Sequence, residues 1–288
     1  MRRRTLVASS ALAIGALSIG AAGEVLSRPA QRAIGLAPRD LPAETALIPT
    51  DSNQMVAGWL LRGQPGRGVM LLLHGVRADR REMTGRARFL WRLGYSVLWI
   101  DLPAHGESPA AHITYGFNEA LGVKAALGYL SREFPAEKVG VIGVSLGAAS
   151  LVLSKPSPAP SAVVLESMFP TIREAVQDRL ALHLGSFAEP AAPMLLWQLD
   201  WRLGISPEQL RPIVDLPALH APVLIAAGDI DRHTTLPETR RIYAAANEPK
   251  ELWIVQGAAH VDLHSFTPVA YEARISEFLA KYMAGRAT

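Results

Sequence analysis

The feature that most constrains the fold is the stretch from Val139 to Leu153, which reads VGVIGVSLGAASLVL. Its first half is a short apolar run, typical of a strand buried on both faces of a parallel sheet, and the part from Leu146 is rich in helix formers. Between them, Gly143 and Gly147 flank Ser145 in the spacing GxSxG. Larger outer residues would collide with neighbouring backbone where a strand turns sharply into a helix. The stretch therefore predicts a turn that presents the Ser145 hydroxyl above a sheet.

The rest of the chain alternates between strand-like and helix-like segments. Apolar runs predict strands at 69–73, 96–100, 139–142, 162–165, 223–226 and 251–255, after an antiparallel hairpin of 45–48 and 56–62. Helical spacing predicts helices at 80–93, 118–134, 236–246 and 271–282, besides the helix from Leu146. This alternation implies an α/β fold with a mostly parallel sheet, right-handed crossovers and helices on both faces. In the 80–93 segment the arginines fall mainly outside the apolar stripe, so we expect a surface helix lying on the sheet.

The alternation breaks between about 167 and 219. This section offers helical segments at 172–184 and 194–203 with no strand between them, which predicts a small helical cap inserted over the sheet. The cap is rich in large apolar side chains, and two interpretations stay open: some line a ligand pocket, or all of them seal the cap onto the sheet. The residues in question are Met168, Phe169, Leu180, Leu184, Phe187, Met194, Leu195, Leu196, Trp197 and Trp201.

Length and composition limit the classes of protein that this chain can belong to. A chain of 288 residues with 49% hydrophobic and 19% charged residues can bury a full core, and we expect one globular domain over 45–288. The absence of cysteine excludes disulfides and thiolate metal sites. Beyond the three arginines at positions 2–4, 26 basic and 26 acidic residues balance, and no basic run is visible. We therefore expect no nucleic-acid partner.

The first 23 residues resemble a targeting segment. Three arginines precede an apolar stretch over 6–22, and the small residues Ala21, Ala22 and Gly23 suit a signal peptidase. We expect an export signal and a periplasmic or extracellular protein, with an uncleaved membrane anchor through residues 6–22 as the alternative. Residues 24–44, which contain prolines and several arginines, are expected to connect this segment to the sheet.

The chemistry of Ser145 needs two further groups. A serine hydroxyl is a weak nucleophile at neutral pH, so an imidazole must take its proton and a third group must orient that imidazole. Two later loops supply both kinds of residue: the 223–226 strand leads into Gly228-Asp229-Ile230-Asp231, and the 251–255 strand leads into Gly257-Ala258-Ala259-His260. Because both loops follow carboxyl ends of strands, they should meet Ser145 at one edge of the sheet.

Five motifs in this order resemble the α/β-hydrolase superfamily, particularly its esterase-like and serine-aminopeptidase-like members with a small helical cap. They are LLLHGV at 71–76, DLPAHGES at 101–108, GVSLG at 143–147, GDID at 228–231 and GAAH at 257–260, and the resemblance covers roughly 45–282. Val76 and Arg77 stand where lipases with an HGGG loop carry further glycines, so the chain differs from that branch.

The resemblance implies a catalytic triad at the matching positions. Ser145 is the expected nucleophile, His260 the general base and Asp231 the group that orients it. Asp229 and Glu166 also follow strands and remain alternatives for the acid.

The same resemblance implies an oxyanion hole made of two backbone N–H groups, those of Leu146 and Val76. Of the other histidines, His74 and His105 are expected to brace loops, and His233 is expected to lie on the surface, with a place facing the pocket as the alternative. No spacing suits a metal site or a phosphate loop, so we expect no cofactor and no metal.

These residues predict a serine hydrolase that cleaves a carboxylic ester, or less readily a thioester or amide, of a small acyl substrate through an acyl-enzyme. An acyltransferase could use the same triad with an alcohol in place of water. A binding protein that keeps the fold without catalysis is the alternative from another class. The oligomeric state is not predicted.

Overall fold

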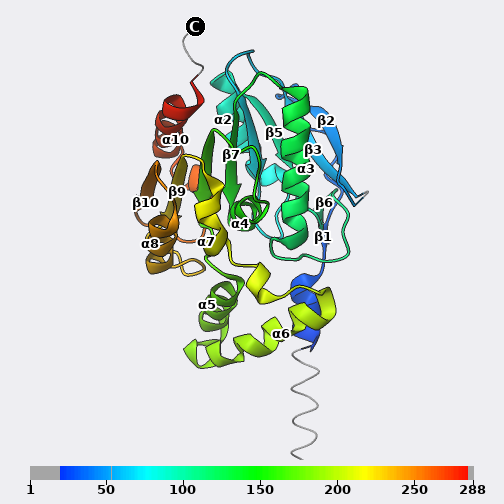
Figure 1. The fold of residues 1–288 in the computed structure, drawn as a ribbon, viewed down its shortest axis with the longest axis vertical. Coiled ribbons are helices and arrows are strands. Elements are labelled where there is room, and N and C mark those ends of the chain that lie inside the picture. Colours follow the sequence, from blue (N-terminus) through cyan, green and yellow to red (C-terminus); the bar gives the residue numbers. More distant parts are fainter. Residues whose placement is uncertain (1–19, 53, 285–288) are drawn as a thin grey trace, which may run out of the picture.

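An eight-stranded sheet forms the centre of the computed structural model, which describes residues 20–52 and 54–284 (Figure 1). Its strand order is β10-β9-β8-β7-β4-β5-β3-β2. The bounds are Glu44–Pro49 (β2), Met55–Leu61 (β3), Val69–Leu73 (β4), Ser96–Ile100 (β5), Val139–Val144 (β7), Ala162–Glu166 (β8), Val223–Gly228 (β9) and Lys250–Val255 (β10). The pairs β2–β3 and β3–β5 are antiparallel and all other neighbours are parallel. The predicted hairpin and parallel sheet are thus both present.

The register of the parallel strands brings their carboxyl ends to one edge. Leu73 pairs with both Ile100 and Gly143, and Val144 pairs with Glu166. Val255 pairs with Gly228 at the far end of the sheet. The loops that follow these residues therefore lie side by side, and they include every sequence-predicted site residue.

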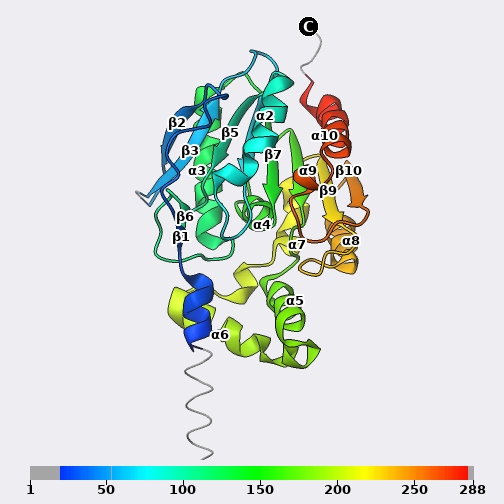
Figure 2. The same cartoon turned by 180° about the vertical axis from the view of Figure 1, so that it is seen from behind.

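Helices cover both faces of the sheet. On one face lie α3 (Phe117–Glu133), α4 (Leu146–Leu153) and α8 (Leu236–Ala245), and on the other lie α2 (Thr84–Arg92), α9 (Leu263–Phe266) and α10 (Pro268–Met283), as Figures 1 and 2 show. Each face has its own apolar core: β4 sends Leu71 and Leu73 to the first and Met70 and Leu72 to the second. Burial on both faces explains why these strands are continuous apolar runs rather than alternating ones.

Between β8 and β9 the described chain contains only helical and irregular structure. It comprises α5 (Ile172–Leu184), η2 (Ser186–Ala191), α6 (Ala192–Leu203), η3 (Pro207–Gln209), α7 (Pro212–Asp215) and η4 (Leu216–Leu219). The first three, α5, η2 and α6, form the cap and project beyond the carboxyl edge of the sheet, whereas α7 returns to the body (Figure 1). A small separate core that includes Ile172, Leu196 and Leu199 holds the cap together.

The segment before the sheet is not a simple connection. Residues 20–27 are helical and lie beside α6, and β1 (Ala30–Gln31) pairs in parallel with β6 (His105–Gly106) (Figure 2). Most of the predicted leader, residues 1–19, lies outside the described residues. Within the described ones, no helix has the length and hydropathy to cross a membrane.

The expectation that the arginines of residues 80–93 face solvent is wrong for two of them. The segment begins as the short helix η1 (Arg80–Met83) and continues as α2, and the side chains of Arg80 and Arg86 are 0% and 1% exposed. Each is buried because it pairs with carboxylates from distant loops, a requirement for a charge in an interior. Two of these partners, Asp101 and Glu166, lie at the carboxyl ends of β5 and β8.

Candidate active site

The strand β7 turns into α4 at Ser145, whose backbone lies at φ 48° and ψ −107°. A non-glycine residue in this region is strained, and such strain is characteristic of a nucleophile between a strand and a helix. A Cβ on Gly143 would lie 2.7 Å from the Ala148 nitrogen, and one on Gly147 would lie 2.5 Å from the Leu73 oxygen. Both flanking positions therefore require glycine, as the spacing predicted.

Backbone contacts fix the serine at the sheet edge. The Ser145 N–H donates to the carbonyl of Glu166 at 2.8 Å, which ties the turn to the end of β8. The residue is 4% exposed. Because Leu146 is the first residue of α4, its N–H has no acceptor within the helix.

Asp231 and His260 come together from the loops after β9 and β10. Asp231 Oδ2 lies 2.8 Å from His260 Nδ1, and its Oδ1 accepts the backbone N–H groups of His233 at 2.8 Å and Thr234 at 3.0 Å. Burial acts to raise the pKa of Asp231, but the hydrogen bond and charge of His260 and the two N–H groups together hold it below its usual value. The carboxylate is thus ionised and fully buried, while 23% of the imidazole remains exposed.

The two other candidate acids have different partners. Asp229 Oδ1 accepts the Gly257 N–H at 2.7 Å and so braces one loop against the other. Glu166 accepts two hydrogen bonds from Arg86, at 2.6 and 3.2 Å, and one from the Tyr271 hydroxyl at 2.5 Å. Of the three acids, only Asp231 is bonded to His260 in the described chain.

Arg86 ties this arrangement to the helix layer. Besides Glu166, it forms an ion pair with Asp262 at 2.8 Å, and Asp262 accepts the N–H groups that begin α9, directly after His260. A buried arginine thereby holds the loop that carries the imidazole. The helical pattern of residues 80–93 gave no sign of this role, because both partners lie far away in the sequence.

The turn after β4 supplies the second expected oxyanion donor, the Val76 N–H. His74 Nε2 accepts the Leu102 N–H at 3.0 Å, so Nδ1 carries the proton and donates to the Gly75 carbonyl at 2.7 Å. Burial lowers the pKa of His74 to about 4, so the ring stays neutral. Because the peptide is planar and trans, a carbonyl held on one side directs the Val76 N–H to the other. That N–H donates no hydrogen bond within the described residues.

The N-terminal segment braces the same turn. Arg77, at φ 59°, donates to the carbonyls of Val25 and Leu26, the latter at 3.0 Å, near the end of the 20–27 helix. Cations are favoured at that end of a helix. Arg32 in turn donates to the Arg77 carbonyl at 3.2 Å. The residues on both sides of the turn are therefore held by a part of the chain that the sequence suggested was only a connection.

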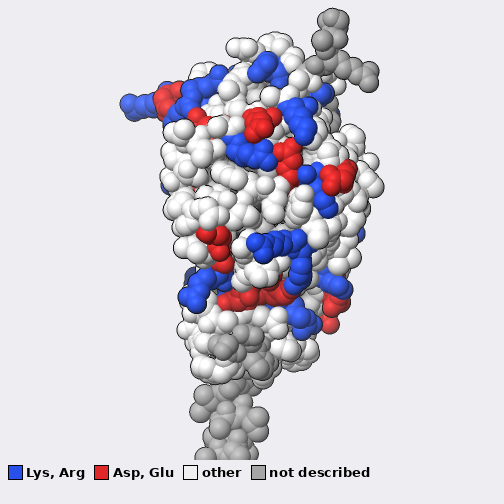
Figure 3. Space-filling view, turned by 90° about the vertical axis from the view of Figure 1, so that its left-hand side faces the viewer, with Lys and Arg blue, Asp and Glu red and all other residues white. Residues whose placement is uncertain are grey.

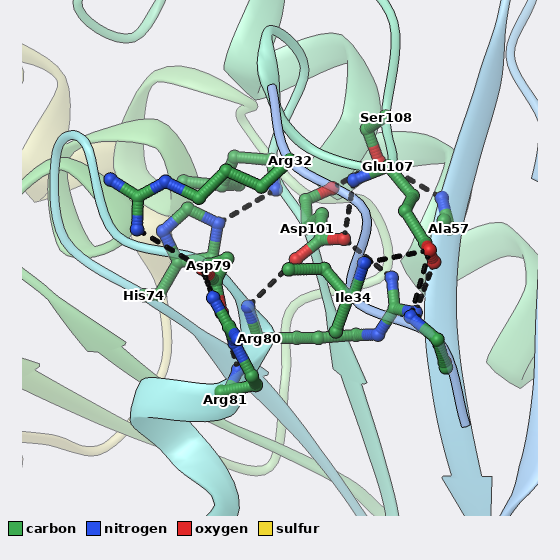
Figure 4. A network of polar contacts seen from close by, with 12 residues as sticks. Arg32, Ile34, Ala57, His74, Asp79, Arg80, Arg81, Asp101, Glu107 and Ser108 are labelled. Carbon is green, nitrogen blue, oxygen red and sulfur yellow. Dashed lines mark hydrogen bonds and ion pairs between the residues drawn. The ribbon is translucent and has the colours of Figure 1, made fainter. Parts of the chain in front are cut away.

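A second buried arginine stabilises the adjacent loop, as Figure 4 shows. Arg80 pairs with Asp101 at 2.5 Å and with Glu107, while the N–H groups of Ile34 and Gly35 each donate to Glu107 at 2.9 Å. The motif at 101–108 is thus a structural clamp between the N-terminal segment and the turn after β4. His105 in this motif has a neutral, buried ring, because burial lowers its pKa to about 4.

His233 lies against the site rather than on the surface. Its ring centroid is 4.8 Å from that of His260, and its Nδ1 is buried without a partner in the described chain. Burial, followed by the neighbouring His260, lowers its pKa. Its place two residues after Asp231 was the one sequence signal for this position.

The site lacks one contact that a complete triad would show. No hydrogen bond joins Ser145 Oγ to His260 in the described residues. Such bonds are often long in unliganded enzymes and shorten when substrate binds. The described residues also contain no group of three or more histidines or carboxylates placed to hold a metal ion.

Comparison with known protein sequences identifies relatives of this chain. The chain matches no protein-family model. It is 29% identical over 227 residues to the uncharacterized protein Rv2307c of Mycobacterium tuberculosis, covering 77% of this chain and 74% of that one. It is 22% identical over 237 residues to the uncharacterized protein YqkD of Bacillus subtilis, covering 81% of this chain and 78% of that one.

Solved structures extend the comparison. The esterase Pf2001 of Pyrococcus furiosus superimposes with a TM-score of 0.75 and 23% identity, over 90% of this chain and 98% of that one. The α/β-hydrolase GrgF from Penicillium sp. sh18 gives a TM-score of 0.66 at 18% identity, over 85% and 100%. An esterase from Thermogutta terrifontis gives a TM-score of 0.60 at 17% identity, over 84% of this chain and 100% of that one. These likenesses confirm the α/β-hydrolase fold that the motifs predicted.

Proposed function

We propose that this chain, which has the α/β-hydrolase fold, is a serine hydrolase that cleaves carboxylic esters through an acyl-enzyme on Ser145. The observation that carries the proposal is the 2.8 Å hydrogen bond between Asp231 and His260 at the sheet edge where the strained Ser145 turn lies. An imidazole oriented by a buried carboxylate, at the same edge as a serine in such a turn, is the arrangement that activates a hydroxyl.

Each residue then has one role. His260 Nε2 takes the Ser145 proton as Oγ attacks the ester carbonyl, gives that proton to the leaving alcohol, and later removes one from the water that hydrolyses the acyl-enzyme. Asp231 accepts the Nδ1–H throughout, which keeps Nε2 free to act as the base and stabilises the imidazolium when it forms. The N–H groups of Leu146 and Val76 donate to the oxyanion of each tetrahedral intermediate.

A small apolar cavity lies within the cap. It lies between the 20–27 helix, α5 and α6, and its lining includes Leu26, Tyr115, Ile172, Val176 and Leu195. Its volume of about 40 Å³ is far below that of a typical ligand pocket, and none of the proposed catalytic residues lines it, so we do not assign the acyl chain to it.

A series of p-nitrophenyl esters of increasing acyl length tests the proposal. The purified chain should release nitrophenol and free acid, and Ser145→Ala should lower turnover by about 10⁴ to 10⁶ with the fold retained. Ser154→Ala, at the other end of α4, is the matched control and should leave turnover unchanged. Equal activity in Ser145→Ala would contradict the assignment, and transfer of the acyl group to an added alcohol in preference to water would make the enzyme an acyltransferase.

A further inference from the structure

The outer face of the cap is apolar and exposed. Five large side chains there are between 54% and 84% accessible to solvent, which is unusual for so short a stretch of a globular protein. They are Leu184, Phe187, Met194, Trp197 and Trp201. Of the ten apolar residues expected to line a pocket or to seal the cap, these five do neither.

The two faces of α6 explain how this surface arises. Leu196 and Leu199 face the cap core, whereas Met194, Trp197 and Trp201, spaced three and four residues apart, form a stripe on the opposite side. The two indole rings of this stripe are 5.8 Å apart. A helix that is apolar on both faces is normally covered on both.

The N-terminal segment approaches the same end of the molecule. Residues 20–27 run along α6, at the end of the protein furthest from the C-terminus (Figures 1 and 2). A Cβ on Gly23 would collide with the side chains of Gln198 and Arg202, and Glu24 forms an ion pair with Arg202. Residues 20–22, the described end of the apolar stretch 6–22, thus belong to a helix that packs on the cap.

We propose that the outer face of the cap docks on a lipid bilayer, with the apolar stretch 6–22 retained as the anchor beside it. Nineteen residues precede the described chain, and they carry most of this stretch and three arginines, which favour a bilayer with anionic headgroups. Indole rings are enriched at the boundary between headgroups and acyl chains. Figure 3 shows one side of the molecule: charged side chains form a band, and the described atoms visible at the cap end below it are mostly uncharged.

Because residues 20–22 belong to the helix packed on α6, an anchor that continues from them would bring the cap, and not the opposite end of the sheet, to the membrane surface. Removal of the leader after Gly23 would instead divide the 20–27 helix and uncover part of α6. The close packing at Gly23 therefore favours the anchor over the cleaved export signal.

Tryptophan quenching in vesicles tests the docking directly. The full chain is reconstituted in vesicles of phosphatidylcholine with a minority of phosphatidylglycerol, prepared with or without brominated acyl chains. Of the six tryptophans, only Trp197 and Trp201 are highly exposed. Brominated lipid should quench them, their quenching by aqueous acrylamide should fall about two-fold on reconstitution, and Trp197→Phe/Trp201→Phe should abolish both signals.

A pair of surface variants separates docking from anchoring. Phe187→Ser/Met194→Ser should reduce quenching by brominated lipid, since it removes apolar contact while leaving both indoles and the 6–22 stretch in place. Val269→Ser, 82% exposed on α10, is the control and should change nothing. Equal quenching of the wild type and the Trp197→Phe/Trp201→Phe variant would overturn the proposal. Shielding of the indoles that depends on protein concentration without vesicles would also overturn it, by identifying a second copy as the occupant.

Discussion

The sheet edge and the cap are built on opposite principles. At the edge, buried arginines bind carboxylates that are distant from them in the sequence: Arg86 pairs with Glu166 and Asp262, and Arg80 pairs with Asp101 and Glu107. The cap instead has a small core and an exposed apolar face, and the α5 contact with the body includes a partly exposed ion pair between Glu174 and Arg241. In the proposals above, the edge holds the reacting groups and the cap docks on the membrane. Variants in the two regions test this division.

The largest effect should come from the acid beside His260. Asp231→Asn should lower kcat by about 10⁴, because an asparagine of the same shape favours the wrong imidazole tautomer. Asp229→Asn, which weakens only the hydrogen bond to the Gly257 N–H, should lower kcat by less than about ten-fold. Steady-state kinetics on an acetyl ester compare the two variants. Similar small losses for both, with a large loss in Glu166→Gln, would transfer the role to Glu166.

The next effect is one of stability, and it contrasts the two regions directly. Arg86→Met should lower the free energy of unfolding by about 3–5 kcal/mol, because it leaves the Glu166 carboxylate buried without its partner. Arg241→Met, which breaks the partly exposed pair with Glu174, should cost about 1 kcal/mol or less. Urea unfolding followed by circular dichroism measures both. Equal losses in the free energy of unfolding would show that ion pairs at the sheet edge and in the cap stabilise the protein to the same extent.

A smaller effect concerns the brace on the oxyanion turn. Arg77→Met should lower kcat about ten-fold with little change in KM, because the Val76 N–H loses alignment but is not removed, and removal of an oxyanion donor costs about 10² to 10³. Arg67→Met is the control, because this exposed arginine hydrogen-bonds to the Leu93 carbonyl and lies over the Tyr95 ring, away from the turn after β4. A rise in KM alone in Arg77→Met would mean that the N-terminal segment shapes the pocket rather than the turn.

The smallest effect is a pH dependence of the cap. Burial, followed by the charge and hydrogen bond of Glu238 on α8, raises the pKa of Asp178 on α5 to about 7, while Arg179 opposes this and Glu174 reinforces it. The folded protein therefore retains a proton that the unfolded chain loses near pH 4, so the α5–α8 contact weakens as pH rises from about 4 through about 7.

Hydrogen exchange checks this prediction after correction for intrinsic rates. Protection of α5 should decrease between about pH 5 and about pH 8 in the wild type, and Asp178→Asn should remove the dependence. Protection of α10 serves as the internal reference. A pH dependence that is unchanged in Asp178→Asn would assign it to another group.

Sequence patterns predicted the elements of this fold well where local chemistry determines them. The continuous apolar runs around Leu71 and Val141 gave the parallel strands, because burial on both faces leaves no alternation. The glycines beside Ser145 gave the turn, because no Cβ fits there. The order of the motifs placed Asp231 and His260 at one edge, where the structure pairs them.

Three features could not be predicted, because they depend on contacts between distant segments. Arg80 and Arg86 lie within or beside the apolar stripe of the 80–93 segment, but a charged side chain is expected at the surface, and only their carboxylate partners make burial favourable. The 20–27 helix carries no periodic signal of the surface on which it packs. His233 lies beside His260, where Asp231 accepts its backbone N–H; its spacing from Asp231 allowed this place only as an alternative to the surface.

Covalent labelling tests the central claim, that Ser145 is a nucleophile activated by His260. A fluorophosphonate reacts with an activated serine and remains attached, so peptide mass spectrometry can locate the adduct. The account predicts one adduct on Ser145 in the wild type, none in Ser145→Ala, and labelling slowed by about 10³-fold or more in His260→Ala. Labelling at another serine, or undiminished labelling in Ser145→Ala, would contradict it.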